Sequence, residues 1–201
     1  MTEPLALRGA HFVQSLERGL AVIRAFSAER PQLTLSEVAR ATGLDRDDIV
    51  YVARVPVSRI MTVSINVGTR FPAYAASMGH VLLAGLPDAE LDARLAGMRL
   101  EPLTPRSKTT PEALRAALRR VRAQGWALVD QELEEGLRSV AAPIRDRRGD
   151  VVAAINVSAH AGRRTIDWMR RELLPKLLAT AARIEDDLGV AGSRRRDRAG
   201  P

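Results

Sequence analysis

A long antiparallel hairpin in the second half of the chain is the feature that most constrains the fold. Two runs rich in small and β-branched residues, Leu137–Ile144 and Val151–Val157, flank the charged turn 145–150, which contains one glycine for a positive φ. A shorter apolar run, Trp126–Val129, leads into this hairpin through the acidic loop 130–135. The pattern therefore predicts three consecutive antiparallel strands.

Small polar side chains interrupt the apolar residues of both hairpin strands. Ser139 lies on the first strand, and Asn156 and Ser158 lie on the second. A sheet face that carries a few short hydrogen-bonding groups is typical of the wall of a small-molecule pocket. The alternative interpretation, that these are ordinary half-exposed strand positions, remains open from spacing alone.

Composition limits the class of protein. The 201 residues are enough for a substantial core, and the absence of cysteine excludes disulfides, a thiol nucleophile and thiolate metal sites. We find no apolar run that could span a membrane and no secretory signal pattern, so we expect a cytoplasmic protein. The formal charge of +7 suggests nucleic acid, but the tail 191–201 alone holds four arginines against one acid, so charge is weak evidence.

The first quarter of the chain has the beginnings of a DNA-binding motif. After a flexible arm, residues 1–11, apolar residues at helical spacing predict a helix over 13–28. A capping box at Thr34–Glu37 opens a short helix that stops at Gly43. This is the opening of a helix-turn-helix. Its candidate DNA-binding residues are Thr34, Ser36, Leu44, Asp45 and Arg46.

The recognition helix that should follow is missing from the sequence. Directly after Arg46, the run Ile49–Val55 is dominated by β-branched and aromatic residues and is ended by Pro56, which predicts a strand. A second strand is predicted over Arg59–Val67, where apolar and polar residues alternate. The segment 12–46 is therefore an incomplete winged helix-turn-helix.

The stretch between residues 68 and 83 contains a second candidate for ligand binding. We expect a loop over Gly68–Pro72 and then a helix over Ala75–Leu83 with Ser77, Gly79 and His80 in its first turns. Free backbone N–H groups at a helix start can bind a carboxylate or a phosphate. The alternative is that Gly79 only permits close packing between helix and sheet.

Further helices are predicted from their boundary residues. Asp88–Ala96 follows a proline, and Thr110 caps a helix over Pro111–Gln124 that ends at a glycine and carries arginines on a solvated face. A last helix over Thr165–Leu188 is predicted to bend at a proline and to end at Gly189, before a disordered basic tail at 191–201. The fold class is α+β: residues 47–190 form an antiparallel sheet with helices on its faces.

Catalysis is not indicated. The three histidines are scattered, and we find no phosphate-binding loop, zinc-protease or nucleophile-elbow motif. The acids of the loop 130–135 are explained more simply as a solvated loop than as a general acid–base pair. We expect no enzymatic activity, no cofactor and no metal.

Taken together, these motifs resemble the IclR family of bacterial transcriptional regulators. The resemblance runs from Phe12 to about Gly189 and is carried by five stretches: Phe12–Phe26, Leu35–Arg46, Gly68–Leu83, Gly136–Asp146 and Ala153–Ser158. Two further stretches, Ser58–Tyr74 and Leu128–Ser139, are similar to the branch that controls aromatic-acid catabolism through the β-ketoadipate pathway.

The resemblance implies a GAF-like effector domain that binds a small aromatic or dicarboxylic acid, such as protocatechuate, 4-hydroxybenzoate or β-ketoadipate. It also implies operator DNA as a partner, assembly as homodimers or tetramers, and no membrane. The positions that match the family's effector contacts are Ser77, Met78, Gly79, Leu137, Ser139, Asn156 and Ser158. The family often has an acid two places after the helix-ending glycine, whereas this chain has Leu128, Val129 and only then Asp130, which leaves the role of Asp130 open.

The jump from Arg46 to Asp47 departs from the family pattern. An internal deletion or a misassembled reading frame would remove the recognition helix, the wing, and the first helix and strand of the effector domain, leaving the strand Ile49–Val55 without its partner. We expect a transcriptional regulator of aromatic-acid genes whose DNA binding is impaired. The alternative is a residual small-molecule-binding or oligomerisation module without DNA binding.

Overall fold

The computed structural model describes residues 47–53 and 68–197, which belong to two compact units, residues 1–71 and 72–201. The expected DNA-binding residues and the predicted strand Arg59–Val67 lie outside the described residues. The boundary between the two units falls after Phe71. Within the described residues, no helix is long and apolar enough for a membrane span.

The described part of the first unit is a strand pair. β1 (Asp48–Val50) is hydrogen-bonded to β2 (Arg70–Pro72), and the Tyr51 amide donates to the Thr69 carbonyl at 3.0 Å. The prediction of a loop over Gly68–Pro72 was therefore wrong in its second half. The β-branched run forms a shorter strand than expected, and it has a partner.

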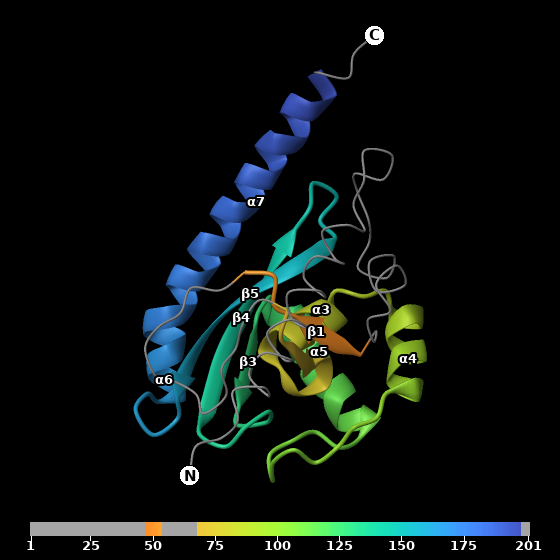
Figure 1. The fold of residues 1–201 in the computed structure, drawn as a ribbon, viewed down its shortest axis with the longest axis vertical. Helices are drawn as coiled ribbons and strands as arrows, with labels where there is room; N and C mark the ends of the chain where they lie inside the picture. Colours follow the sequence, from red (N-terminus) through yellow and green to blue (C-terminus); the bar gives the residue numbers. More distant parts are fainter. Residues whose placement is uncertain (1–46, 54–67, 198–201) are drawn as a thin grey trace, which may run out of the picture. The chain divides into compact units, whose positions relative to one another are not determined.

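The second unit is built on a three-stranded antiparallel sheet in the order β3–β4–β5 (Figure 1). The strands are β3 (Ala127–Asp130), β4 (Leu137–Arg145) and β5 (Val151–His160), which confirms the predicted hairpin. Gly149 has a φ of 86° in the β4–β5 turn, a conformation that glycine adopts without strain.

Helices cover both faces of this sheet (Figure 1). One face carries α3 (Ser77–Ala84), which follows a short 3-10 turn, η1 (Ala73–Ala75), and packs against α5 (Pro111–Gln124). The other face carries α7 (Leu174–Asp197). α4 (Asp88–Gly97) lies between α3 and α5 in the chain.

α5 has the boundaries that its sequence predicts. The Thr110 side chain accepts a hydrogen bond from the Ala113 amide at 3.2 Å, and Gly125 ends the helix with a φ of 80°. Arg119, Arg120 and Arg122 are exposed, as predicted, but Arg122 also makes contacts within the protein. Its guanidinium donates to the carbonyls of Ala84 and Leu86 and pairs with Asp88, so it ties α5 to the end of α3.

The last helix differs from the prediction. It begins as α6 (Ile166–Trp168), capped by Thr165, passes through a π-helical turn, η2 (Met169–Leu173), and continues as α7 to Asp197. Gly189 does not end it, and residues 191–197, expected in a disordered tail, form its last turns. A glycine costs only about 1 kcal/mol within a helix, which neighbouring helix-forming residues offset.

The core on the α7 side forms where alternate β4 residues meet the last helix. It consists of Val140, Ala142, Ile144, Ala159, Met169, Leu177 and Ala181, all of them buried. Since side chains alternate across a strand, the odd-numbered β4 residues point to the opposite face, toward α3.

Candidate functional site

The start of α3 is held tightly against the turn that precedes it. A Cβ on Gly79 would lie 2.1 Å from the carbonyl oxygen of Ala73, closer than any side chain can approach. Glycine is therefore required at this position for packing. The sequence left two interpretations of Gly79, a role in ligand binding and a role in close packing. The structure supports close packing, and Gly79 packs against η1 rather than against the sheet.

The predicted sheet residues share the face that α3 covers. The register pairs Ser139 with Ser158 and Ala141 with Asn156, and these residues alternate with those that pack on α7. Ser139 is buried, whereas Asn156 and Ser158 are half-buried and joined by a 3.3 Å hydrogen bond from Asn156 Nδ2 to Ser158 Oγ. The half-exposed interpretation thus fits two of the three residues and not Ser139.

The predicted effector contacts thus lie on α3 and on the strands against which it packs. Ser77, Met78 and Gly79 open the helix, and the other four are on the facing strands: Leu137, Ser139, Asn156 and Ser158. Met78 and Leu137 are both buried. The role of these residues as ligand contacts stays a prediction.

Ser77 is the polar group that opens α3. Its side chain is 2% exposed, and its Oγ has no hydrogen-bond partner among the described residues. The N-cap residue, Ala76, has no side chain that could satisfy the first N–H groups of the helix. A buried hydroxyl beside free helix N–H groups is suited to hold an anionic oxygen.

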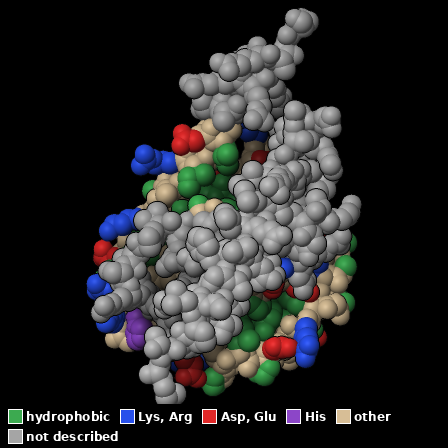
Figure 2. Space-filling model, viewed as in Figure 1, with side chains coloured by type: hydrophobic (Ala, Val, Ile, Leu, Met, Phe, Trp, Pro, Cys, Tyr) green, Lys and Arg blue, Asp and Glu red, His purple; other side chains and the backbone are tan. Residues whose placement is uncertain are grey.

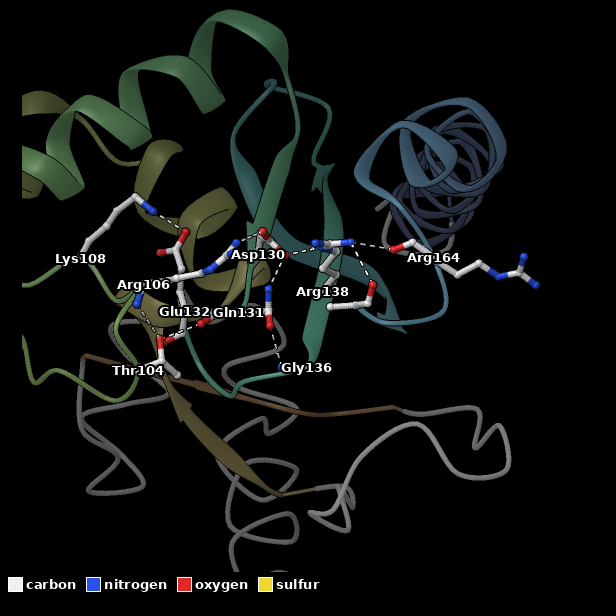
Figure 3. Close-up of polar contacts among 10 residues, drawn as sticks. Thr104, Arg106, Lys108, Asp130, Gln131, Glu132, Gly136, Arg138 and Arg164 are labelled. Atoms are coloured by element: carbon white, nitrogen blue, oxygen red, sulfur yellow. Dashed lines mark hydrogen bonds and ion pairs between the residues drawn. The ribbon is translucent and has the colours of Figure 1, made fainter.

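The acidic loop between β3 and β4 is only partly solvated: Glu135 is exposed, as predicted, but the prediction was wrong for Glu132. Glu132 is 6% exposed and pairs with Lys108 through Oε1 (Figure 3). The Glu132 backbone carbonyl accepts from Ser107 Oγ at 2.7 Å, and the Gln131 carbonyl accepts from Thr104 Oγ1 at 2.7 Å. The loop before α5 therefore binds the acidic loop by both backbone and side-chain contacts.

Asp130 has a structural partner on each side. Its carboxylate pairs with Arg106 through one oxygen and with Arg138 through the other (Figure 3). Arg138 also donates to the carbonyls of Ala161 and Arg164 at 3.2 and 2.8 Å. Asp130 thus joins the loop before α5 to β4 and, through Arg138, to the β5–α6 connection. This ion network gives Asp130 a structural role.

His80 is the buried titratable group of α3. Its Nε2 donates to the Tyr74 carbonyl at 2.6 Å, and burial lowers the pKa of the imidazole to about 4, which Lys108 and Arg120 reinforce by charge. His80 is therefore neutral at neutral pH. Glu132 Oε2 lies 3.9 Å from the same nitrogen, too far for a hydrogen bond.

Sequence reasoning missed Glu132 because acidic residues in a loop are usually exposed. Its burial depends on Lys108, which lies 24 positions away in the chain.

The described residues hold no group of three or more His, Asp or Glu side chains placed for a metal ion. On the face shown in Figure 2, basic and acidic side chains of the described part lie interspersed.

Comparison with known proteins identifies relatives of the same kind. The family model of the bacterial transcriptional regulator IclR C-terminal domain matches residues 22–186. The Pca regulon regulatory protein of Pseudomonas putida is 48% identical over 148 residues, which are 73% of this chain and 51% of the relative. The chain spans about half the length of this relative and 52% of the regulator KdgR from Escherichia coli.

Solved structures show the same fold. A transcriptional regulator from Rhodococcus sp. RHA1 superimposes with a TM-score of 0.70 at 42% identity, covering 89% of this chain and 99% of that one. The inducer-binding domain of PobR from Acinetobacter, solved with 3-hydroxybenzoic acid, gives a TM-score of 0.65 at 29% identity, covering 71% and 83%.

By their names, these relatives act in transcription regulation and not as enzymes, as the lack of catalytic motifs predicted. The α+β fold with an antiparallel sheet and flanking helices is likewise confirmed. The match covers most of the described sheet and helices, including the start of α3 and the β3–β4 loop. The chain belongs to the IclR family of bacterial transcriptional regulators, and the part that matches is the family's C-terminal domain.

Proposed function

We propose that this chain is the effector-binding part of a transcriptional regulator of aromatic-acid catabolism, and that a small carboxylic acid binds between α3 and the sheet. The observation that carries the proposal is Ser77. Its buried hydroxyl lacks a partner among the described residues, and it opens a helix over a sheet face that carries Ser139. A buried polar group without a partner costs about 1–3 kcal/mol, which a bound carboxylate oxygen would offset.

The relatives support the choice of ligand class. The Pca regulon regulatory protein is named for control of the pca regulon, and the PobR domain was solved with a hydroxybenzoic acid. Carried over to this chain, these names suggest protocatechuate, 4-hydroxybenzoate or β-ketoadipate as candidate effectors. Ser77, Met78, Gly79, Leu137, Ser139, Asn156 and Ser158 would form the site.

Titration calorimetry of the purified chain with these three acids tests the proposal. We expect heat of binding with at least one acid. Replacing Ser77 with alanine should weaken binding by roughly tenfold or more, because a hydrogen bond to a charged group contributes about 1.5–3 kcal/mol. Thr180→Ala, which removes a hydroxyl from an exposed position on α7, should leave the affinity unchanged. Absence of heat with all three acids would count against the proposal.

We further propose that the chain acts in the cytoplasm, assembles as a homodimer or tetramer and binds operator DNA poorly. Asp47 is a turn residue and β1 begins at Asp48, which leaves no room for a recognition helix directly after Arg46. This observation favours the second candidate function, a ligand-binding or oligomerisation module without DNA binding.

A further inference from the structure

We infer that Glu132 is a specificity-determining residue of the proposed site, and that its free carboxylate oxygen accepts a hydrogen bond from a hydroxyl group of the bound acid. The inference rests on the proposed function, since it assumes a ligand between α3 and the sheet. It adds a chemical requirement: the effector carries a hydroxyl in addition to its carboxylate.

The position of the Glu132 carboxylate is fixed by contacts around it. Lys108 Nζ donates to Oε1, and Thr104 Oγ1 donates to the neighbouring Gln131 carbonyl (Figure 3). Ser107 Oγ donates to the Glu132 backbone carbonyl at 2.7 Å. These contacts hold both the main chain and one oxygen of the carboxylate. Such rigid support is what a preorganised binding group requires.

The second oxygen of the same carboxylate is buried and lacks a hydrogen-bond partner among the described residues. His80 Nε2 lies 3.9 Å from this oxygen and does not satisfy it, because it donates its hydrogen to the Tyr74 carbonyl at 2.6 Å. Ser77, whose hydroxyl is also unpartnered, precedes His80 by three residues, which puts both on the same side of α3. Two unsatisfied polar groups thus lie on or against one side of this helix.

The chemistry of the two groups differs. Ser77 and the N–H groups at the start of α3 donate hydrogen bonds and favour a carboxylate. The Glu132 oxygen accepts, and its negative charge disfavours a second anion next to it. A donor group on the ligand is therefore required at this end, and a hydroxyl provides one without adding positive charge. Burial raises the pKa of the Glu132 carboxyl, and the ion pair with Lys108 acts against this shift by favouring the charged form.

Calorimetric titration with matched acids tests the inference. The probes are protocatechuate and 4-hydroxybenzoate, each compared with benzoate and with 4-methoxybenzoate, which has no hydroxyl donor. We expect the wild-type chain to bind at least one hydroxylated acid roughly tenfold or more tightly than either analogue, because a hydrogen bond to a charged acceptor contributes that much. In E132Q this preference should shrink to roughly threefold or less, while benzoate binding stays the same within about twofold.

Two controls keep the test decisive. E135Q removes an exposed carboxylate from the same loop and should keep the full preference. If E132Q does not fold because Lys108 is left unpaired, the double variant K108M/E132Q removes both charges together and should show the same loss of preference.

The outcomes separate this inference from the proposed function. Equal binding of hydroxylated and non-hydroxylated aromatic acids, tight binding of β-ketoadipate alone, or an unchanged preference in E132Q would overturn the role of Glu132 and leave an acid-binding site in place. If none of the acids binds, both the inference and the proposed function fail.

Discussion

Gly79 has no room for a side chain, because the carbonyl oxygen of Ala73 lies 2.1 Å from the position that its Cβ would take. We predict that Gly79→Ala destabilises the protein by about 1–3 kcal/mol, the usual cost of forcing a methyl group into a packed region. Gly97→Ala is the matched control, since nothing lies within 4 Å of a Cβ there. Urea unfolding of both variants checks the prediction, and equal stability of the two would contradict it.

His80 makes a pH-dependent contribution to stability. Burial lowers the pKa of His80 from 6.5 to about 4. Between these two pH values, the imidazole is protonated in the unfolded chain but not in the folded chain. The contribution of His80 to the free energy of unfolding is therefore fully present above pH 6.5 and is lost as the pH falls toward 4. We predict that the wild type loses about 3 kcal/mol more than His80→Gln over this window, from a shift of about 2.5 pKa units.

Unfolding free energies measured between pH 7 and pH 4 test this prediction. Glutamine can still donate a hydrogen bond to the Tyr74 carbonyl, so the variant isolates the protonation. Burial raises the pKa of Glu132, so this residue makes the protein more stable, not less, as the pH falls. The same contribution is present in the wild type and in His80→Gln, and it cancels when the two are compared. Parallel pH profiles for the two proteins would refute the role of His80.

Among the helices, α5 is attached to the end of α3 by one side chain. Arg122 donates hydrogen bonds to the backbone carbonyls of Ala84, at the end of α3, and of Leu86, just after it. A hydrogen bond from Arg122 and its positive charge both lower the pKa of Asp88. Cations at a helix C-terminus are stabilising.

Replacing Arg122 with methionine should cost about 1 kcal/mol, since the group is partly exposed and solvent weakens its ion pair. Arg119→Met, at an exposed position on the same helix, should change stability by less than about 0.5 kcal/mol. Thermal unfolding of the two variants compares them directly. A melting temperature for Arg122→Met as high as that of Arg119→Met would show that the tether is not needed.

Elements whose boundaries depend on local residues could be predicted from the sequence. Thr110 and Gly125 set the two ends of α5, and Gly149 set the turn between β4 and β5. The end of the last helix could not be predicted, because the preference of Gly189 for ending a helix is small beside the contributions of its neighbours. The same limit applies to β2, whose three residues depend on pairing with β1.

The candidate site could be predicted from the sequence only in part, because some of its residues are positioned by contacts with distant parts of the chain. Strand alternation placed Ser139, Asn156 and Ser158 on one face, because that pattern is local. The burial of Glu132 depends on Lys108, and the position of Asp130 depends on Arg106 and Arg138. Contacts between residues that lie far apart in the chain leave no periodic pattern in the sequence.

For the whole molecule, the proposed lack of operator binding leads to a direct prediction. In an electrophoretic shift assay at low salt, with the promoter of a neighbouring aromatic-degradation operon, we expect no sequence-specific shift, because β1 begins where a recognition helix would be. The Pca regulon regulatory protein of Pseudomonas putida serves as the reference on its own promoter. Calorimetry with the bound acid shows that the same preparation is folded. A shift that survives excess unrelated DNA would overturn the proposal and would require a DNA-binding surface in the chain other than the helix-turn-helix.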